Sequence, residues 1–209
     1  ASGASEADII EKIDIGGIYW MGENLKTTQF NDGTPIPTGF ATSEAWMIQC
    51  GSDLPACQVD RAANADAPGA MQYRNLYGVL YNLFAMKGNI APQGWHVPSK
   101  AELQALVDFV GADARKLKST AIGKGIGSWM ESAGIEGDNL TGFTALPANT
   151  VEGSNGSTGA SETTGQWWST EADYRIRMSF RSNSVEQLTP GVAGLGEGNS
   201  IRCVRDANY

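Results

Sequence analysis

Hydrophobic residues recur with a helical period directly after the stretch Gly94–Ser99. Four apolar side chains fall on one helix face at spacings of three, four and seven: Leu103, Leu106, Val107 and Val110. Ser99 is a good N-cap, and Glu102, three residues later, completes the pattern of a capping box. Gly111 is suited to end the helix. We therefore predict a helix over 100–110 that covers Trp95 and Val97.

A second helical pattern occupies residues 73–87. Its apolar positions share one face: Leu76, Val79, Leu80, Leu83 and Phe84. Gly88 and Asn89 follow as an ending signal. This spacing predicts one continuous helix.

Alternating apolar and polar positions indicate strands near both ends of the chain. Residues 13–20 predict a hairpin, because Gly16-Gly17 supplies a two-residue turn between apolar positions. Residues 174–181 alternate, with Tyr174, Ile176, Met178 and Phe180 on one side and polar residues on the other. Residues 182–188 predict a neighbouring strand, and residues 201–205 predict a buried one. We expect the two terminal strands to pair.

These elements predict an α+β fold in which two helices flank a small, mostly antiparallel twisted sheet with many loops. The 26 glycines favour turns and short strands over a helix bundle. We expect a flexible tether at 1–11 and a single domain at 12–209, with a surface insertion at 49–70. Five residues are predicted to lie in the core: Leu83, Trp95, Leu106, Phe143 and Trp168.

Several motifs resemble, in their order along the chain, those of the Fibrobacter succinogenes major paralogous domain, a family of secreted bacterial proteins. They are YWMGENLKTTQFNDGTPIP, YRNLYGVLYN, PQGWHVPSKAEL, KLKST, NLTGFTALPA, WWSTE and SIRCVRD. The resemblance spans about residues 12–206. That family is similar to C-type lectin-like domains, so the resemblance implies a C-type lectin-like fold, while a fold alone does not determine function.

The net charge of −8 argues against a nucleic-acid partner, because binding to phosphates requires a basic face. No apolar run has the length of a transmembrane span. The polar start Ala-Ser-Gly-Ala-Ser-Glu is typical of a trimmed N-terminus behind a signal or lipid anchor. We therefore expect an extracellular or cell-surface location in a bacterium, with lipid anchoring as one form of attachment.

Three cysteines leave more than one pairing open. Cys50 and Cys57 bracket a short loop and are predicted to form a disulfide, while a pair between Cys203 and either of them is the alternative. The resembling family has a cysteine where this chain has Ala91, and that cysteine is expected to pair with the one in the closing strand. The resemblance thus implies that Cys203 has lost its usual partner and is a buried thiol.

Candidate catalytic and metal-binding groups are sparse. His96 is the only histidine, lies between core-like residues and is expected to be structural. Zinc-type spacings do not occur, and neither do the Glu-Pro-Asn, Gln-Pro-Asp and Trp-Asn-Asp motifs with which C-type lectins bind calcium. Residues 136–139 suit a turn as well as a hard cation. We predict no catalytic residue, no metal and no cofactor.

The C-terminal third is the candidate ligand-binding region. Large, mostly polar side chains gather there between two apolar anchors: Trp167, Asp173, Tyr174, Arg175, Arg177, Arg181, Asn183, Glu186 and Gln187. Tyrosine and arginine supply stacking area and forked hydrogen bonds at interfaces. The region resembles the variable segment of proteins diversified by retroelements, which also use a C-type lectin-like fold. An ordinary solvated pair of strands is the competing interpretation, and Trp167 is equally consistent with the core.

We therefore predict a non-enzymatic recognition domain that binds a protein through this third of the chain, with a carbohydrate as the second candidate ligand. It would be a variable protein of a diversity-generating retroelement. Two alternatives remain: an oxidase related to formylglycine-generating enzymes, which would need copper-binding or redox cysteines, and a structural module of a surface adhesin.

Overall fold

The computed structural model describes residues 10–59, 66, 68–123, 126–132, 134–152, 156–158, 162–171, 173–188, 194 and 196–205. Most of the expected tether, residues 1–9, lies outside the described residues. Ile10 packs partly against the core, and the Glu11 carbonyl accepts a hydrogen bond from the Gly22 amide at 2.8 Å.

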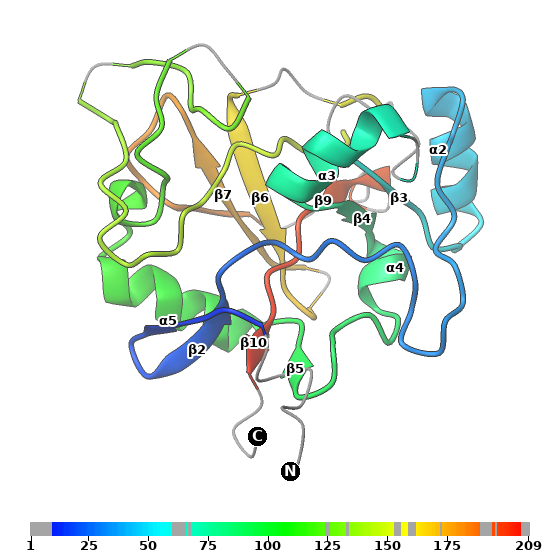
Figure 1. The fold of residues 1–209 in the computed structure, drawn as a ribbon, viewed down its shortest axis with the longest axis horizontal. Coiled ribbons are helices and arrows are strands. Elements are labelled where there is room, and N and C mark those ends of the chain that lie inside the picture. The colour runs from blue at the N-terminus through cyan, green and yellow to red at the C-terminus, as the bar shows by residue number, and fades with distance from the viewer. Residues whose placement is uncertain are drawn as a thin grey trace.

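The described part of the chain has an α+β architecture of short elements (Figure 1). Its helices are α2 (Ser43–Gly51), α3 (Met71–Tyr77), α4 (Leu83–Met86) and α5 (Lys100–Val110), with 3₁₀ turns at Pro68–Ala70 and Ala114–Lys116. Its strands are β1 (Lys12–Ile15), β2 (Ile18–Met21), β3 (Cys57–Gln58), β4 (Leu80–Asn82), β5 (Trp95–His96), β6 (Thr164–Trp168), β7 (Arg175–Ser179), β8 (Glu186–Leu188), β9 (Gly198–Asn199) and β10 (Val204–Arg205).

The named strands form three small antiparallel sheets rather than the one sheet predicted. Their orders are β1-β2-β10-β5, β3-β4-β9 and β6-β7-β8. The predicted pairing of the terminal strands is confirmed, because Val204 of β10 lies opposite Trp20 of β2. The predicted hairpin is also confirmed, with Ile15 opposite Ile18 and positive φ angles at Gly16 and Gly17.

The helix predicted over 100–110 forms as α5, with both halves of the capping box present. Ser99 Oγ accepts from the Glu102 amide at 3.2 Å, and the Glu102 carboxylate accepts from the Ser99 amide at 2.8 Å. Gly111 ends the helix in the left-handed conformation. In Figure 1, α5 and α2 lie on opposite sides of the molecule.

The continuous helix predicted over 73–87 is wrong. The chain leaves α3 at Gly78, forms β4 and then re-enters a short helix, α4. Gly78 has φ +81°, and a Cβ there would lie 2.7 Å from Asn24 Cβ. The break therefore lets the chain pass close to the segment after β2, and it leaves Leu76 exposed instead of buried.

The interpretation of 49–70 as a surface insertion is also corrected. Within its described part, Ala56 through Val59 are buried, and β3 pairs with the central strand β4. The five predicted core residues are all buried, in two clusters on either side of the central strands. Trp46 anchors a third, smaller cluster beneath α2.

Candidate functional site

Three of the nine predicted ligand-binding residues are buried and cannot form a ligand surface. Trp167, Tyr174 and Arg175 are 1%, 3% and 8% exposed. Trp167 donates from Nε1 to Asn24 Oδ1 at 2.9 Å and packs edge-on against Phe143. Tyr174 belongs to the cluster beneath α5, and burial raises the pKa of its hydroxyl. The prediction that Trp167 and Tyr174 bind a ligand is therefore wrong, because both side chains pack in the core.

Arg175 is buried among Gln166, Trp168 and Glu197. Its Nε donates to Gln166 Oε1 at 2.9 Å, and its Nη2 donates to Glu197 Oε1 at 2.8 Å. The guanidinium also lies 6.0 Å from the ring centre of Trp168. Burial lowers the pKa of Arg175 and raises the pKa of Glu197. This pair therefore attaches β9 to β7 instead of facing a ligand.

The other six residues lie at the surface around the β7–β8 hairpin: Asp173, Arg177, Arg181, Asn183, Glu186 and Gln187. We call this set the hairpin surface. Arg177 and Glu186 are cross-strand partners, with Nε donating to Oε2 at 2.9 Å. Arg181 lies 5.0 Å from the ring of Phe180, and Gln187 points to the opposite side of the sheet from Glu186. The surface is therefore a rim around a hairpin, not one flat face.

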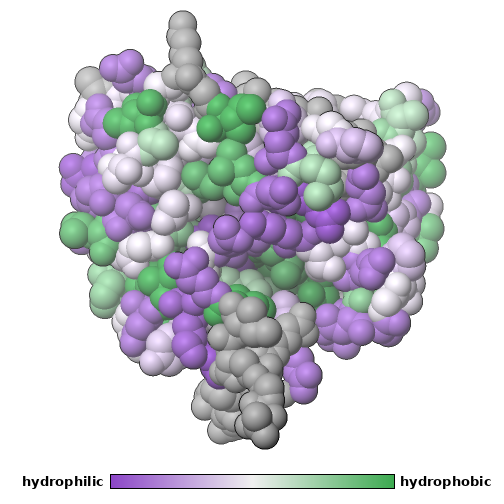
Figure 2. All heavy atoms as spheres, in the orientation of Figure 1, coloured by the Kyte–Doolittle hydropathy of each residue, from purple (hydrophilic) through white to green (hydrophobic). Residues whose placement is uncertain are grey.

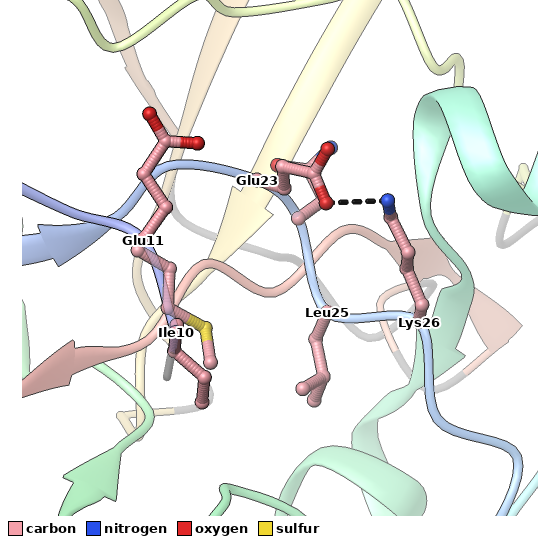
Figure 3. Close-up of a pocket in the computed structure, with 7 residues that line it drawn as sticks. Ile10, Glu11, Glu23, Leu25 and Lys26 are labelled. Carbon is pink, nitrogen blue, oxygen red and sulfur yellow. Dashed lines mark hydrogen bonds and ion pairs between the residues drawn. The ribbon is translucent and has the colours of Figure 1, made fainter. Parts of the chain in front are cut away.

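Sequence reasoning missed a groove beside the first hairpin. Two cavities of about 390 and 520 Å³ adjoin there and share Glu11, Glu23 and Asn24. Figure 3 shows the first: Glu11, Glu23 and Lys26 extend to one side, and Ile10 and Leu25 to the other. In Figure 2 a band of hydrophilic residues crosses the middle of this face of the molecule.

Arg202 lines the larger cavity although only 2% of its surface is exposed. Its Nε and Nη2 donate to Asn24 Oδ1 at 3.0 and 2.8 Å, its Nη1 donates to the Phe143 carbonyl, and its guanidinium lies 4.1 Å from the Phe143 ring centre. Burial lowers the pKa of Arg202 to about 9. Within the described residues no carboxylate lies in ion-pair distance of it. The one sequence signal for this group is a cation in the otherwise apolar stretch 201–204.

The predicted disulfide between Cys50 and Cys57 does not form. Both residues and Cys203 are buried thiols. Cys50 belongs to the cluster beneath α2 and lies 3.3 Å from Asn82 Nδ2, whereas Cys57 belongs to the central cluster and donates to the Ile36 carbonyl at 3.8 Å. The two ends of the loop between them therefore pack in different hydrophobic clusters. The predicted buried thiol of Cys203 is confirmed.

Burial raises the pKa of Cys50, and it raises the pKa of Cys57 to about 12. A thiol that stays protonated is a poor nucleophile and a poor metal ligand. This environment does not favour the redox chemistry that the oxidase alternative requires of its cysteines.

His96 serves the start of α5. Its Nε2 lies 3.0 Å from Glu102 Oε1, so the histidine contacts the same carboxylate that caps the helix. A structural role for His96 is consistent with this geometry.

Among the described residues there is no group of three or more histidine, cysteine, aspartate or glutamate side chains placed to hold a metal ion. Asp138 Oδ1 accepts from the Leu140 amide at 3.0 Å, and Asn139 Oδ1 accepts from the Thr144 amide at 2.7 Å, as in a turn. None of the described helices has the length and apolar character needed to cross a bilayer.

Comparison with known proteins gives one match. A family model described as the Fibrobacter succinogenes major domain matches residues 13–205, nearly the whole chain. No curated protein and no solved structure matches this chain. The resemblance found in the sequence motifs is thereby confirmed.

Proposed function

The chain belongs to the Fibrobacter succinogenes major domain family, and from that premise we propose that it is a non-enzymatic recognition domain of a secreted or surface-displayed bacterial protein. Its ligand would be another protein, bound through the hairpin surface. We further propose that the three sheets and their helices are a variant of the C-type lectin-like fold. The pairing of the terminal strands β2 and β10 supports that assignment.

The observation that carries the proposal is the alternation of buried and accessible side chains along β7. Ile176 and Met178 point into the cluster beneath α5 and are fully buried, whereas Arg177 between them reaches the surface. The inward side chains hold the strand, so we expect substitution of Arg177, an outward residue that reaches the surface, to leave the fold intact. A scaffold of this kind suits a recognition surface that changes while its framework stays constant.

The chemistry of the hairpin surface suits a protein partner. Arg177 and Arg181 offer planar guanidinium groups for paired hydrogen bonds, and Asn183 and Gln187 offer exposed amides. The surface carries both signs of charge, which favours a mixed polar interface over binding to a polyanion. A carbohydrate is the second candidate, since amides and guanidinium groups also bind hydroxyls.

Binding can be tested on arrays of purified secreted and surface proteins beside an array of glycans. The wild type is compared with the double variant Arg181→Ala/Gln187→Ala. The matched control is Gln72→Ala/Lys87→Ala, which changes an exposed residue on α3 and an exposed residue directly after α4. We expect a protein signal that the control keeps and the double variant loses. Signals on glycans alone would replace the protein partner with a carbohydrate, and equal signals from both variants would contradict the site.

Diversification by a retroelement is a separable part of the proposal. It requires a near-copy of the DNA that encodes about residues 171–199, differing mainly at adenines, beside a reverse transcriptase gene. Without such a copy near the gene this part fails, while ligand binding is still tested by the arrays.

A further inference from the structure

The groove beside the first hairpin contains a buried cation with unused hydrogen-bonding capacity. A guanidinium has five N–H groups, and Arg202 uses three of them, on Asn24 Oδ1 and the Phe143 carbonyl. One N–H on each terminal nitrogen has no acceptor among the described residues. Both acceptors in use are neutral, and the Glu23 carboxylate acts on the guanidinium only from beyond ion-pair distance, so no direct contact balances the positive charge. A buried charge left in this state is costly unless an anion reaches it.

The cavity that Arg202 lines gives an anion room to approach. Its volume is about 520 Å³, and its lining includes Thr144 and Asn75, which carry further hydrogen-bonding groups. A carboxylate fits the forked donor pattern of a guanidinium well, because two N–H groups can meet two oxygens. The floor of the cavity therefore favours a carboxylate.

The rim of the same cavity carries charges of both signs. Glu11, Glu23 and Lys12 line it; Glu23 is paired with Lys26, and Lys12 Nζ lies 5.7 Å from the ring centre of Tyr19. The Glu11 carboxylate is exposed and has no side-chain partner among the described residues. The Glu11 carboxylate repels a plain anion and attracts an ammonium group. A cation at the floor and an anion at the rim select a ligand that carries both charges.

Apolar side chains form the remaining wall. Ile13, Leu76 and Leu146 line the cavity together with the charged groups. Leu76 is one of the exposed large hydrophobic residues of the chain, and burying it against a ligand would remove apolar surface from water. The wall thus suits an aliphatic side chain.

We propose that this cavity binds a compact zwitterion of the free amino-acid class with an aliphatic side chain, its carboxylate on Arg202 and its ammonium group at Glu11. This site is separate from the hairpin surface and does not depend on the function proposed above. Neither Arg202 nor Glu11 belongs to the residues predicted from the sequence to bind a ligand.

Calorimetric titration with four related probes tests the charge pattern. L-leucine carries both charges, 4-methylpentanoate lacks the ammonium group, 3-methylbutylamine lacks the carboxylate, and glycyl-leucine separates the two charges by one residue. We expect saturable binding of L-leucine that is at least ~10-fold tighter than binding of each other probe, a ratio that corresponds to one charge-assisted hydrogen bond or more. Absence of saturable leucine binding would overturn the proposal. Equally tight binding of glycyl-leucine would overturn the free amino-acid class in favour of a peptide C-terminus.

Variants test the two ends separately. Glu11→Gln should weaken leucine at least ~10-fold and should not weaken 4-methylpentanoate, because it removes the partner of the ammonium group together with a charge that repels the free carboxylate. Glu44→Gln, the same change on α2 away from the cavity, should leave both affinities unchanged. Arg202→Lys should weaken leucine and 4-methylpentanoate alike. If Arg202→Lys does not fold, the affinities of leucine and 4-methylpentanoate for Glu11→Gln still test the orientation of the ligand. An equal change in both affinities, or no change in either, would overturn the assigned orientation.

Discussion

The Asn24 side chain joins several distant segments by hydrogen bonds. Its Oδ1 accepts from Trp167 Nε1 and twice from Arg202, and its Nδ2 donates to the Tyr77 carbonyl at 2.9 Å. The side chain is buried. One amide thus links the segment after β2 with α3, β6 and the segment before β10.

Replacing Asn24 with alanine should therefore be severe. Asn24→Ala leaves the buried guanidinium and the indole N–H without their acceptor, and we expect a loss of about 3 kcal/mol in the free energy of unfolding. Urea denaturation measures the loss. Asn183→Ala, at an exposed asparagine, is the matched control and should cost less than about 0.5 kcal/mol. Equal effects of the two variants would show that the network contributes nothing.

Cys57 should make stability fall in alkaline solution. Burial raises the pKa of its thiol from 9.0 to about 12. Above pH 9 the unfolded chain loses this proton while the folded chain keeps it, so the unfolded state binds fewer protons and the free energy of unfolding decreases as pH rises. At pH 10.5 the loss from this residue should be about 2 kcal/mol relative to pH 8.

The variant Cys57→Ala isolates that contribution, because the other titrating groups remain. We expect the pH-dependent difference between wild type and variant to appear in urea denaturation at pH 8 and 10.5. Parallel pH profiles in the two proteins would contradict the burial of the thiol. In the wild-type sample a thiol reagent should label three cysteines after denaturation, whereas a count of one would restore the disulfide predicted from the sequence.

At the scale of elements, the interruption between α3 and β4 has a specific cause. Gly78 and Gly17 have nearly the same positive φ, +81° and +85°, but different surroundings. A Cβ at Gly78 would lie 2.7 Å from Asn24 Cβ and 2.8 Å from the Leu25 carbonyl oxygen, whereas a Cβ at Gly17 would have nothing within 4 Å. Comparing alanine substitutions at these two glycines therefore distinguishes the cost of backbone strain from the cost of steric crowding.

We expect Gly17→Ala to cost about 1 kcal/mol, the usual strain of a left-handed alanine. Gly78→Ala should cost at least about 2 kcal/mol more, since backbone and Cβ atoms must move apart. Thermal or urea unfolding of the pair provides the comparison. Similar costs would mean that strain alone fixes the break.

The helices and strands also show which features can be predicted from the sequence and which cannot. The capping signals around Ser99 and Gly111 are local, and they predicted α5 correctly. The break at Gly78 depends on the approach of Asn24, which is 54 residues away, and a helical period cannot report that contact. Likewise Arg175 and Arg177 lie on one side of β7, and the contacts of Arg175 with Gln166, Trp168 and the distant Glu197 make it buried while Arg177 is accessible.

At the scale of the whole molecule, the chain combines fixed cores with a polar hairpin rim. Alternation along the sequence predicted that β7 has an inner and an outer side, and the burial of Ile176 and Met178 confirms the inner one. Arg202 was missed because a lone cation in an apolar strand gives no pattern to count. Its burial follows from the convergence of β2, the 143–146 segment and β10, which is a property of the fold.

The central claim is that recognition belongs to the hairpin surface while the core only supports it. The most direct measurement is titration calorimetry of the partner found on the protein array against Arg181→Ala and Gln187→Ala, with Lys87→Ala as the control and unfolding curves recorded for each. We predict that at least one hairpin variant loses about 2 kcal/mol or more of binding free energy while its stability stays within about 0.5 kcal/mol of the wild type. Unchanged affinity in both hairpin variants, with the fold intact, would contradict the account.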